Sequence, residues 1–185
     1  MIRIIAGKYR GRKLKVPQGI DIRPSSDQVR EGLFNMLYAL VKFESMIFID
    51  LYAGTGALGL EALSRGAKKV IFIEVSQKNM SVLKKNIDSI SPKKTSFELF
   101  KDISAQWLTI FADPGHACVV FLDPPFSGNE YEPILNQLNA LPSIHAGSLI
   151  VVESNKDNEI LFPESFLLLK HRRYGSVKID ILLKQ

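Results

Sequence analysis

Apolar, strand-like runs alternate with helical segments along this chain, and that alternation constrains the fold more than any other feature. The five apolar runs are 46–50, 69–74, 95–100, 117–123 and 148–154. Helical segments are expected at 24–42, from the glycine-rich stretch after residue 50 through Arg65, and at 76–91, 103–112 and 131–141. The runs are continuously apolar rather than alternating, which is typical of parallel strands that are covered by helices on both faces.

The tail adds two further strands. The runs FLLLKHRRY (166–174) and VKIDILL (177–183) are joined at Gly175 and predict an antiparallel hairpin at one edge of the sheet. Together with the five apolar runs they make seven strands. We therefore expect an α/β fold with a seven-stranded, mostly parallel sheet and helices on both faces.

Positive charge is concentrated at the start of the chain. The 185 residues carry a net charge of +5, yet residues 1–30 alone hold eight cations and two acids, a net charge of +6. Two short strand-like runs, IRIIA and KLKV, flank a turn-like stretch at 7–11. We expect a basic β-ribbon over residues 1–24, followed by one α/β domain over 25–185. An ordered basic ribbon suits a phosphate backbone, and a merely solvated segment is the alternative.

Composition excludes several classes of protein. The single cysteine, Cys118, lies in an apolar run and is expected to be a buried, inert thiol, so no disulfide framework is possible. No stretch approaches the length of about 18 apolar residues that a membrane span needs. The N-terminus does not resemble a signal peptide, so the cytoplasm is the expected compartment, with no membrane partner. No cluster of metal-ligating residues is evident.

A glycine-rich turn follows the first apolar run. Asp50 ends that run, and Gly54, Gly56 and Gly59 form a G-x-G-x-x-G pattern where the helix begins. Small residues let a ligand approach the backbone, and the helix N-terminus offers free N–H groups. Glu74 ends the second run, 20 residues after Gly54, where a carboxylate can accept hydrogen bonds from ribose hydroxyls. The pattern indicates an adenosine-containing cofactor and leaves both NAD and S-adenosylmethionine open.

Two carboxylates favour S-adenosylmethionine. Asp50 lies just before the glycine loop, where it can serve the cationic amino group of a methionine moiety. Asp102 follows the third run, where it can accept from an adenine amino group, although a helix N-cap is an equally good interpretation of the local sequence.

The tetrapeptide Asp123-Pro124-Pro125-Phe126 ends the fourth run. Two consecutive prolines stop a strand and leave nearby carbonyls without a ladder partner. The Asp123 side chain and the Pro124 carbonyl can each accept one hydrogen of a planar NH₂ group, and Phe126 can stack on the ring that bears it. Two such acceptors would orient the lone pair and stabilise positive charge that grows on the nitrogen.

Taken together, these motifs resemble the class I S-adenosylmethionine-dependent methyltransferases, which have a Rossmann-like sheet. The blocks RIIAGKYRGRKLKVP, IRPSSDQVREGLFNML, FIDLYAGTGALGLEALSRGA and FLDPPF resemble more closely the bacterial RsmD-type family, which methylates N2 of a guanine in 16S ribosomal RNA. The chain departs mildly from that family, with Ser25 where Thr is common and Tyr52 where Phe is common.

The resemblance implies a role for each of three groups of residues. The cofactor-binding positions would be Asp50, Tyr52, Ala53, Gly54, Gly56, Glu74, Val75, Asp102 and Ile103. The catalytic, target-base positions would be Asp123, Pro124, Pro125 and Phe126. Arg10, Arg23 and Arg30 would lie towards the RNA or the base pocket, and the basic N-terminal run adds the other expected RNA-binding residues, Arg3, Lys8, Arg12 and Lys13.

The resemblance also implies S-adenosylmethionine as cofactor, with S-adenosylhomocysteine as product, and 16S rRNA in an assembled or assembling small subunit as partner. We expect a monomer. The alternatives are a DNA adenine-N6 or protein glutamine methyltransferase, an NAD-dependent oxidoreductase, and a non-catalytic RNA-binding assembly factor. We therefore expect that deleting residues 1–16 weakens RNA binding and its salt dependence and leaves cofactor affinity nearly unchanged.

Overall fold

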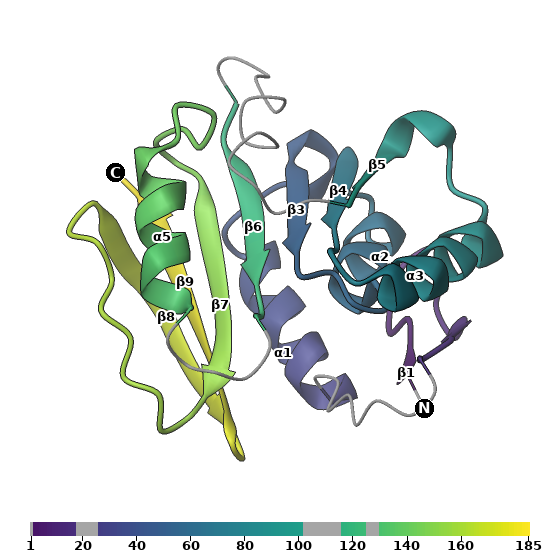
Figure 1. The fold of residues 1–185 in the computed structure, drawn as a ribbon, viewed down its shortest axis with the longest axis horizontal. Helices are drawn as coiled ribbons and strands as arrows, with labels where there is room; N and C mark the ends of the chain where they lie inside the picture. The colour runs from purple at the N-terminus through teal and green to yellow at the C-terminus, as the bar shows by residue number, and fades with distance from the viewer. Residues whose placement is uncertain (1, 18–25, 102–115, 125–129) are drawn as a thin grey trace. The chain divides into compact units, whose positions relative to one another are not determined.

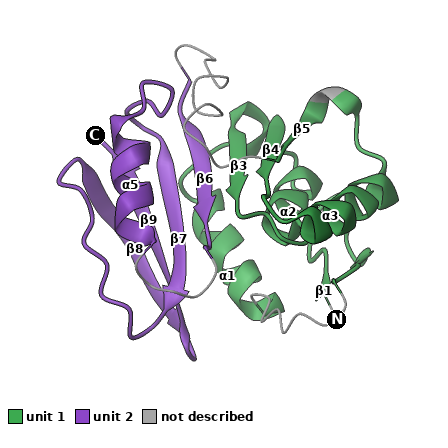
Figure 2. Cartoon of the chain, viewed as in Figure 1, with its two compact units in different colours: residues 1–103 green, residues 104–185 purple. Residues whose placement is uncertain are grey.

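The computed structural model describes residues 2–17, 26–101, 116–124 and 130–185 (Figure 1). The chain divides into two compact units, Met1–Ile103 and Ser104–Gln185 (Figure 2). Seven strands form the main sheet and two more form a separate ribbon.

The ribbon opens the first unit. Strand β1 (Ile2–Arg3) pairs antiparallel with β2 (Lys13–Leu14). Its apolar side chains, Ile2, Ile4 and Leu14, are buried. Its cations are exposed, on the strands and on the turn between them; they are Arg3, Lys8, Arg10, Arg12, Lys13 and Lys15.

Helix α1 (Asp27–Tyr38) starts where its cap forms. The Ser26 hydroxyl accepts a hydrogen bond from the Val29 N–H at 3.2 Å, which satisfies one of the free donors of the first turn. The helix ends at Tyr38, short of the predicted residue 42, with Ala39 as its C-cap. A 3₁₀ turn at Phe43–Ser45 follows. Its buried apolar side chains are Val29, Leu33, Phe34 and Leu37.

Three parallel strands complete the first unit, in the order β5-β4-β3. They are β3 (Ile47–Leu51), β4 (Lys69–Ile73) and β5 (Phe97–Phe100), the last preceded by a 3₁₀ turn at Lys94–Ser96. Helix α2 (Ala57–Ser64) follows β3, and α3 (Gln77–Ile90) follows β4. Each helix thus connects two parallel strands, as the alternating pattern predicts.

The second unit holds four strands in the order β6-β7-β9-β8. Strand β6 (Cys118–Leu122) is parallel to β7 (Leu149–Asn155), and α5 (Tyr131–Ala140) lies between them in sequence. The closing hairpin consists of β8 (Phe166–Tyr174) and β9 (Val177–Lys184), both antiparallel to their neighbours. Cys118 is buried, as expected, and burial raises the pKa of its thiol to about 11.

The predicted fold class is confirmed, including the edge hairpin at Gly175. The strand bounds agree with the predicted runs within two residues. The helix predicted at 103–112 lies outside the described residues. No helix within the described ranges is long and apolar enough to cross a membrane. The same ranges hold no group of three or more His, Cys, Asp or Glu placed to bind a metal ion.

Candidate active site

The turn between β3 and α2 is unusually tight. Tyr52, Gly54 and Gly56 all have positive φ, at 59°, 55° and 80°. The Ala53 N–H donates to the Ile73 carbonyl of β4 at 2.9 Å, which holds the turn against the end of the neighbouring strand. A bulky residue in the left-handed region costs free energy, so the conformation of Tyr52 marks a locally strained segment of the kind found at ligand sites.

The glycines of this loop serve different purposes. A Cβ at Gly56 would lie 2.4 Å from Leu83, and one at Gly59 would lie 2.2 Å from Phe72, so these two glycines let α2 pack closely. A Cβ at Gly54 would meet no protein atom nearer than 3.8 Å. Gly54 therefore leaves open space at the backbone, which is what a ligand that touches the loop requires.

Asp50 is buried at the end of β3, 3% exposed. Its Oδ2 accepts a hydrogen bond from the Gly59 N–H at 2.9 Å. Burial raises the pKa of this carboxyl to about 8, the Gly59 bond opposes that rise, and the nearby Glu74 charge adds to it. A cationic group placed against Asp50 would favour its ionised form, because opposite charges lower a carboxyl pKa.

Glu74, also buried, follows the last residue of β4 and reaches across to the glycine loop. Its Oε2 accepts from the Gly54 N–H at 2.8 Å, and its Oε1 accepts from the Ser76 N–H at 2.7 Å. Both oxygens are thus fixed, and each keeps acceptor capacity for a hydroxyl. The next residue, Val75, is 49% exposed, which places an apolar surface beside this carboxylate.

The second candidate group lies in the other unit. Asp123, exposed, and Pro124, buried, follow directly on β6. Tyr131, at the start of α5, is a neighbour that the sequence did not reveal. Its hydroxyl donates to the Glu153 carbonyl at 3.0 Å, and burial together with the Asp123, Glu153 and Glu130 charges raises its pKa. Tyr131 therefore stays a neutral donor beside Asp123.

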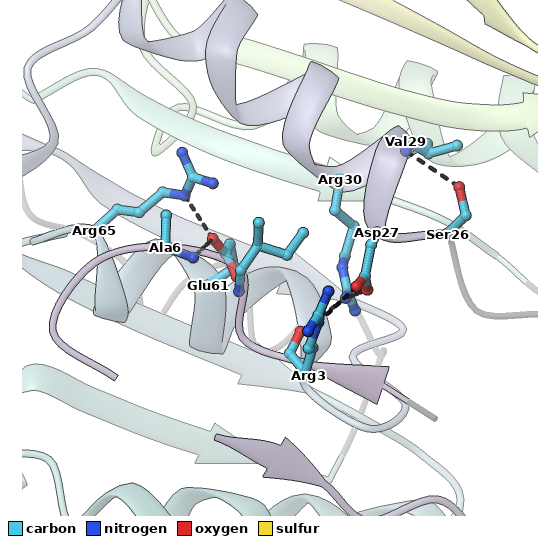
Figure 3. A network of polar contacts seen from close by, with 9 residues as sticks. Arg3, Ala6, Ser26, Asp27, Val29, Arg30, Glu61 and Arg65 are labelled. Carbon is cyan, nitrogen blue, oxygen red and sulfur yellow. Dashed lines mark hydrogen bonds and ion pairs between the residues drawn. The ribbon is translucent and has the colours of Figure 1, made fainter. Parts of the chain in front are cut away.

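The basic ribbon is fastened to α2 by a buried carboxylate (Figure 3). Glu61, fully buried, accepts from the N–H groups of Ile5 at 2.7 Å and Ala6 at 3.0 Å. It also pairs with Arg65 Nε at 2.6 Å. The Arg65 guanidinium in turn lies 4.8 Å from the ring centroid of Phe34 on α1. Glu61 thus joins the ribbon to α2, the helix that follows the glycine loop.

Two further side chains secure the ribbon. The Ser64 hydroxyl donates to the Ala6 carbonyl at 2.5 Å and accepts from the Tyr9 N–H at 2.9 Å. Asn86, 1% exposed, accepts from the Lys15 N–H at 2.7 Å and donates to the carbonyls of Lys15 at 3.0 Å and Thr55 at 2.9 Å. Through Asn86 the ribbon is bonded to the glycine loop itself.

Arg30 is buried rather than exposed, at 1%. Its Nη2 donates to the Arg3 carbonyl and to Asp27 Oδ1, both at 2.8 Å (Figure 3). Asp27 also pairs with Arg3 at 2.8 Å. In this arrangement Arg30 ties α1 to the ribbon. Its contact with RNA stays a prediction.

This chain is similar to known proteins over almost its whole length. A family model described as "Conserved hypothetical protein 95", the RsmD family, matches residues 2–183. Ribosomal RNA small subunit methyltransferase D of Haemophilus influenzae is 39% identical over 95% of this chain and 90% of its own length. The Escherichia coli protein of the same name is 36% identical over 95% of this chain and 86% of its own length. The chain belongs to the RsmD family.

Two solved structures, described as a putative methyltransferase and a putative methylase, are similar to this chain over nearly its whole length. Escherichia coli yhhF has a TM-score of 0.82 at 33% identity, covering 100% of this chain and 98% of that chain. Haemophilus influenzae HI0767 has a TM-score of 0.78 at 36% identity, covering 99% of this chain and 98% of that chain.

The RsmD-family positions divide between the two units. The structure gathers Asp50, the glycine loop, Glu74 and Val75 at the carboxyl ends of β3 and β4. It places Asp123 and Pro124 at the carboxyl end of β6. The remaining predicted positions lie outside the described residues; they are Arg23, Asp102, Ile103, Pro125 and Phe126.

Sequence reasoning missed the residues that hold the ribbon. Glu61 lies in the run ALGLEALS, where a lone acid in an otherwise apolar helix could have signalled a buried partner. Nothing local distinguishes Asn86, because its role depends on two backbone segments far away in sequence.

Proposed function

We propose that this chain transfers a methyl group from S-adenosylmethionine to the exocyclic N2 of a guanine in 16S rRNA. The observation that carries the proposal is the placement of two buried carboxylates, Asp50 and Glu74, which each bond a backbone N–H of the open glycine loop or the helix after it. Membership of the RsmD family supports the reaction, as do its relatives, which bear the name of an rRNA methyltransferase.

The residues at the glycine loop fit the proposed cofactor. When bound, S-adenosylmethionine supplies an electrophilic methyl group on a sulfonium centre. Asp50 would face the cationic amino group of its methionine part. Glu74, held by the Gly54 and Ser76 N–H groups, would accept from the ribose hydroxyls, and exposed Val75 would contact the adenine. Gly54 offers the close approach that this placement needs.

The residues after β6 suit the target amine. Asp123 and the Pro124 carbonyl would each accept one hydrogen of the guanine NH₂, which leaves the nitrogen lone pair directed at the methyl carbon. As the nitrogen–carbon bond forms and the carbon–sulfur bond breaks, Asp123 stabilises the positive charge on nitrogen. One hydrogen is then lost as a proton to Asp123 or to water. The target base must leave its stack to reach this site.

The exposed cations of the ribbon support RNA as the partner. Six of them lie on one short scaffold that the buried network fixes in place. A fixed group of exposed cations suits a phosphate backbone and would supply affinity rather than sequence choice. We further propose that the substrate is an assembled or assembling small subunit, that the enzyme acts as a monomer, and that the reaction takes place in the cytoplasm.

The role of Asp123 is testable by separating chemistry from cofactor binding. We expect Asp123→Ala to lower the rate of methyl transfer at least about 100-fold, because an acceptor for the developing charge is lost. Cofactor affinity should stay within about twofold, measured by isothermal titration alongside a tritiated-methyl assay on small subunits. The control is Asp157→Ala, which removes an exposed carboxylate from the turn after β7. Near-normal turnover by Asp123→Ala would refute the role.

A further inference from the structure

Strand β8, at the edge of the second unit, carries a dense group of cations. Lys170, Arg172 and Arg173 are exposed, and Lys178 lies opposite on β9. No acid occurs between residues 165 and 179. The Lys178 ammonium already donates to the Asn158 carbonyl. We call Lys170, Arg172 and Arg173 the edge-strand cations.

Their charges are poorly balanced within the protein. In the described part of the chain, Lys170, Arg172 and Arg173 form no ion pair. Arg173 stands directly opposite Lys178 in the ladder. Like charges at facing positions destabilise a strand pair, so this arrangement does not serve folding. The nearest acid on β9, Asp180, is committed to His171 at 2.6 Å.

The strand register places two of these cations, Arg172 and Arg173, level with the proposed target-base residues. Leu122 of β6 faces Val152, Val152 faces Asp180, and Asp180 faces His171. One row further along, Glu153 faces Ile179, and Ile179 faces Arg172. Asp123 and Pro124 directly follow Leu122. Arg172 and Arg173 therefore continue the rows of Asp123 and Pro124, three strand spacings away, about 14 Å.

We propose that the edge-strand cations form a second RNA-contact surface, which binds phosphates of the strand flanking the target guanine. The proposal rests on the proposed function, since it takes RNA as the substrate. This surface differs from the ribbon surface in two ways. It belongs to the same unit as Asp123, and it includes residues in the strand rows next to Asp123 and Pro124. Neutralising an unpaired cation that contacts phosphate lowers affinity across all sequences and reduces its salt dependence.

Charged residues on an edge strand also serve another purpose, because they discourage edge-to-edge pairing between molecules. That role would require the cations to keep the chain monomeric and would leave RNA affinity untouched. The two roles are therefore separable by measuring RNA binding on monomeric protein.

The test compares Arg172→Ala/Arg173→Ala with two matched double variants. Arg172→Lys/Arg173→Lys keeps both charges, and Lys84→Ala/Lys85→Ala removes two exposed charges from α3. Binding of each monomeric protein to a full-length 16S rRNA transcript is titrated over a series of salt concentrations. We expect the alanine pair at β8 to reduce the slope of log K against log salt by about 1.4–2 and to raise Kd about tenfold near physiological salt.

The lysine pair should retain the wild-type slope, and the α3 pair should change it little. An unchanged slope in Arg172→Ala/Arg173→Ala, with or without aggregation of that variant, would overturn the proposal. Methyl transfer by the wild-type protein to small ribosomal subunits is measured in parallel. If the wild type binds RNA through β8 but transfers no methyl group, the proposed function fails while the second surface stands.

Discussion

At the scale of single residues, the burial of Asp50 has the largest chemical consequence. A carboxylate taken out of water becomes harder to ionise unless a cation or donors compensate, and one N–H bond from Gly59 compensates only in part. The folded chain therefore holds a proton on Asp50 up to a pH of about 8, whereas the unfolded chain loses it near 3.8. A cationic ligand group would replace that proton.

This difference sets the sign of a pH effect on stability. Between about pH 4 and pH 8 the folded state binds more protons at Asp50 than the unfolded state, so the free energy of unfolding falls as pH rises. The fall is at most about 1.4 kcal/mol per pH unit, the limit for one proton. Asp50→Asn should flatten this part of the profile, measured by urea unfolding of the unliganded protein at several pH values.

The control for this experiment is Asp88→Asn, an exposed carboxyl on α3 that should leave the profile unchanged. Asp50→Asn should also weaken binding of S-adenosylmethionine at least about tenfold, because the partner of its amino group loses its charge. If the free energy of unfolding changed with pH in the same way for wild type and Asp50→Asn, Asp50 would not titrate as described.

At the scale of elements, the ribbon and α2 behave as one piece. The sequence predicts a separable basic arm, but the structure argues against separability. Deleting residues 1–16 would strip Glu61 of both backbone donors and Asn86 of its bonds to Lys15. Because Asn86 also holds the Thr55 carbonyl, the deletion would disturb the glycine loop. Charge-removing substitutions are therefore the better probe of the ribbon's part in RNA binding.

Glu61 gives a direct test of this attachment. Glu61→Gln leaves the buried Arg65 without its carboxylate and points an amide donor at backbone N–H groups. We expect a loss of about 3–5 kcal/mol in the free energy of unfolding, the cost of breaking a buried ion pair from one side. Glu31→Gln, on the exposed face of α1, should change stability by less than about 0.5 kcal/mol. Equal losses of unfolding free energy for the two variants, measured by denaturant titration, would contradict the attachment of the ribbon through Glu61.

At the scale of the whole molecule, local pattern was enough to predict the sheet. The apolar runs specify buried parallel strands, and Gly175 marks the edge hairpin, so the fold class followed from periodicity and turn residues. Asp50, the glycine loop and Glu74 were also predictable, because strand ends of a parallel sheet converge at one edge.

What the sequence could not reveal depends on contacts between distant segments. Arg30 was expected at the RNA, yet its side chain is buried and donates to the Arg3 carbonyl, 27 residues away in sequence. Only the register of β6, β7, β9 and β8 places Arg172 and Arg173 in the rows of Asp123 and Pro124. Tyr131 likewise becomes a neighbour of Asp123 only through the packing of α5.

The central claim is methylation of guanine N2 in 16S rRNA, and a nucleoside map tests it most directly. Nucleoside mass spectrometry of 16S rRNA from cells lacking this protein should show the loss of one N2-methylguanosine. Expression of the wild-type chain should restore it, and expression of Asp123→Ala should not. An unchanged N2-methylguanosine content in the deleted cells would contradict the account.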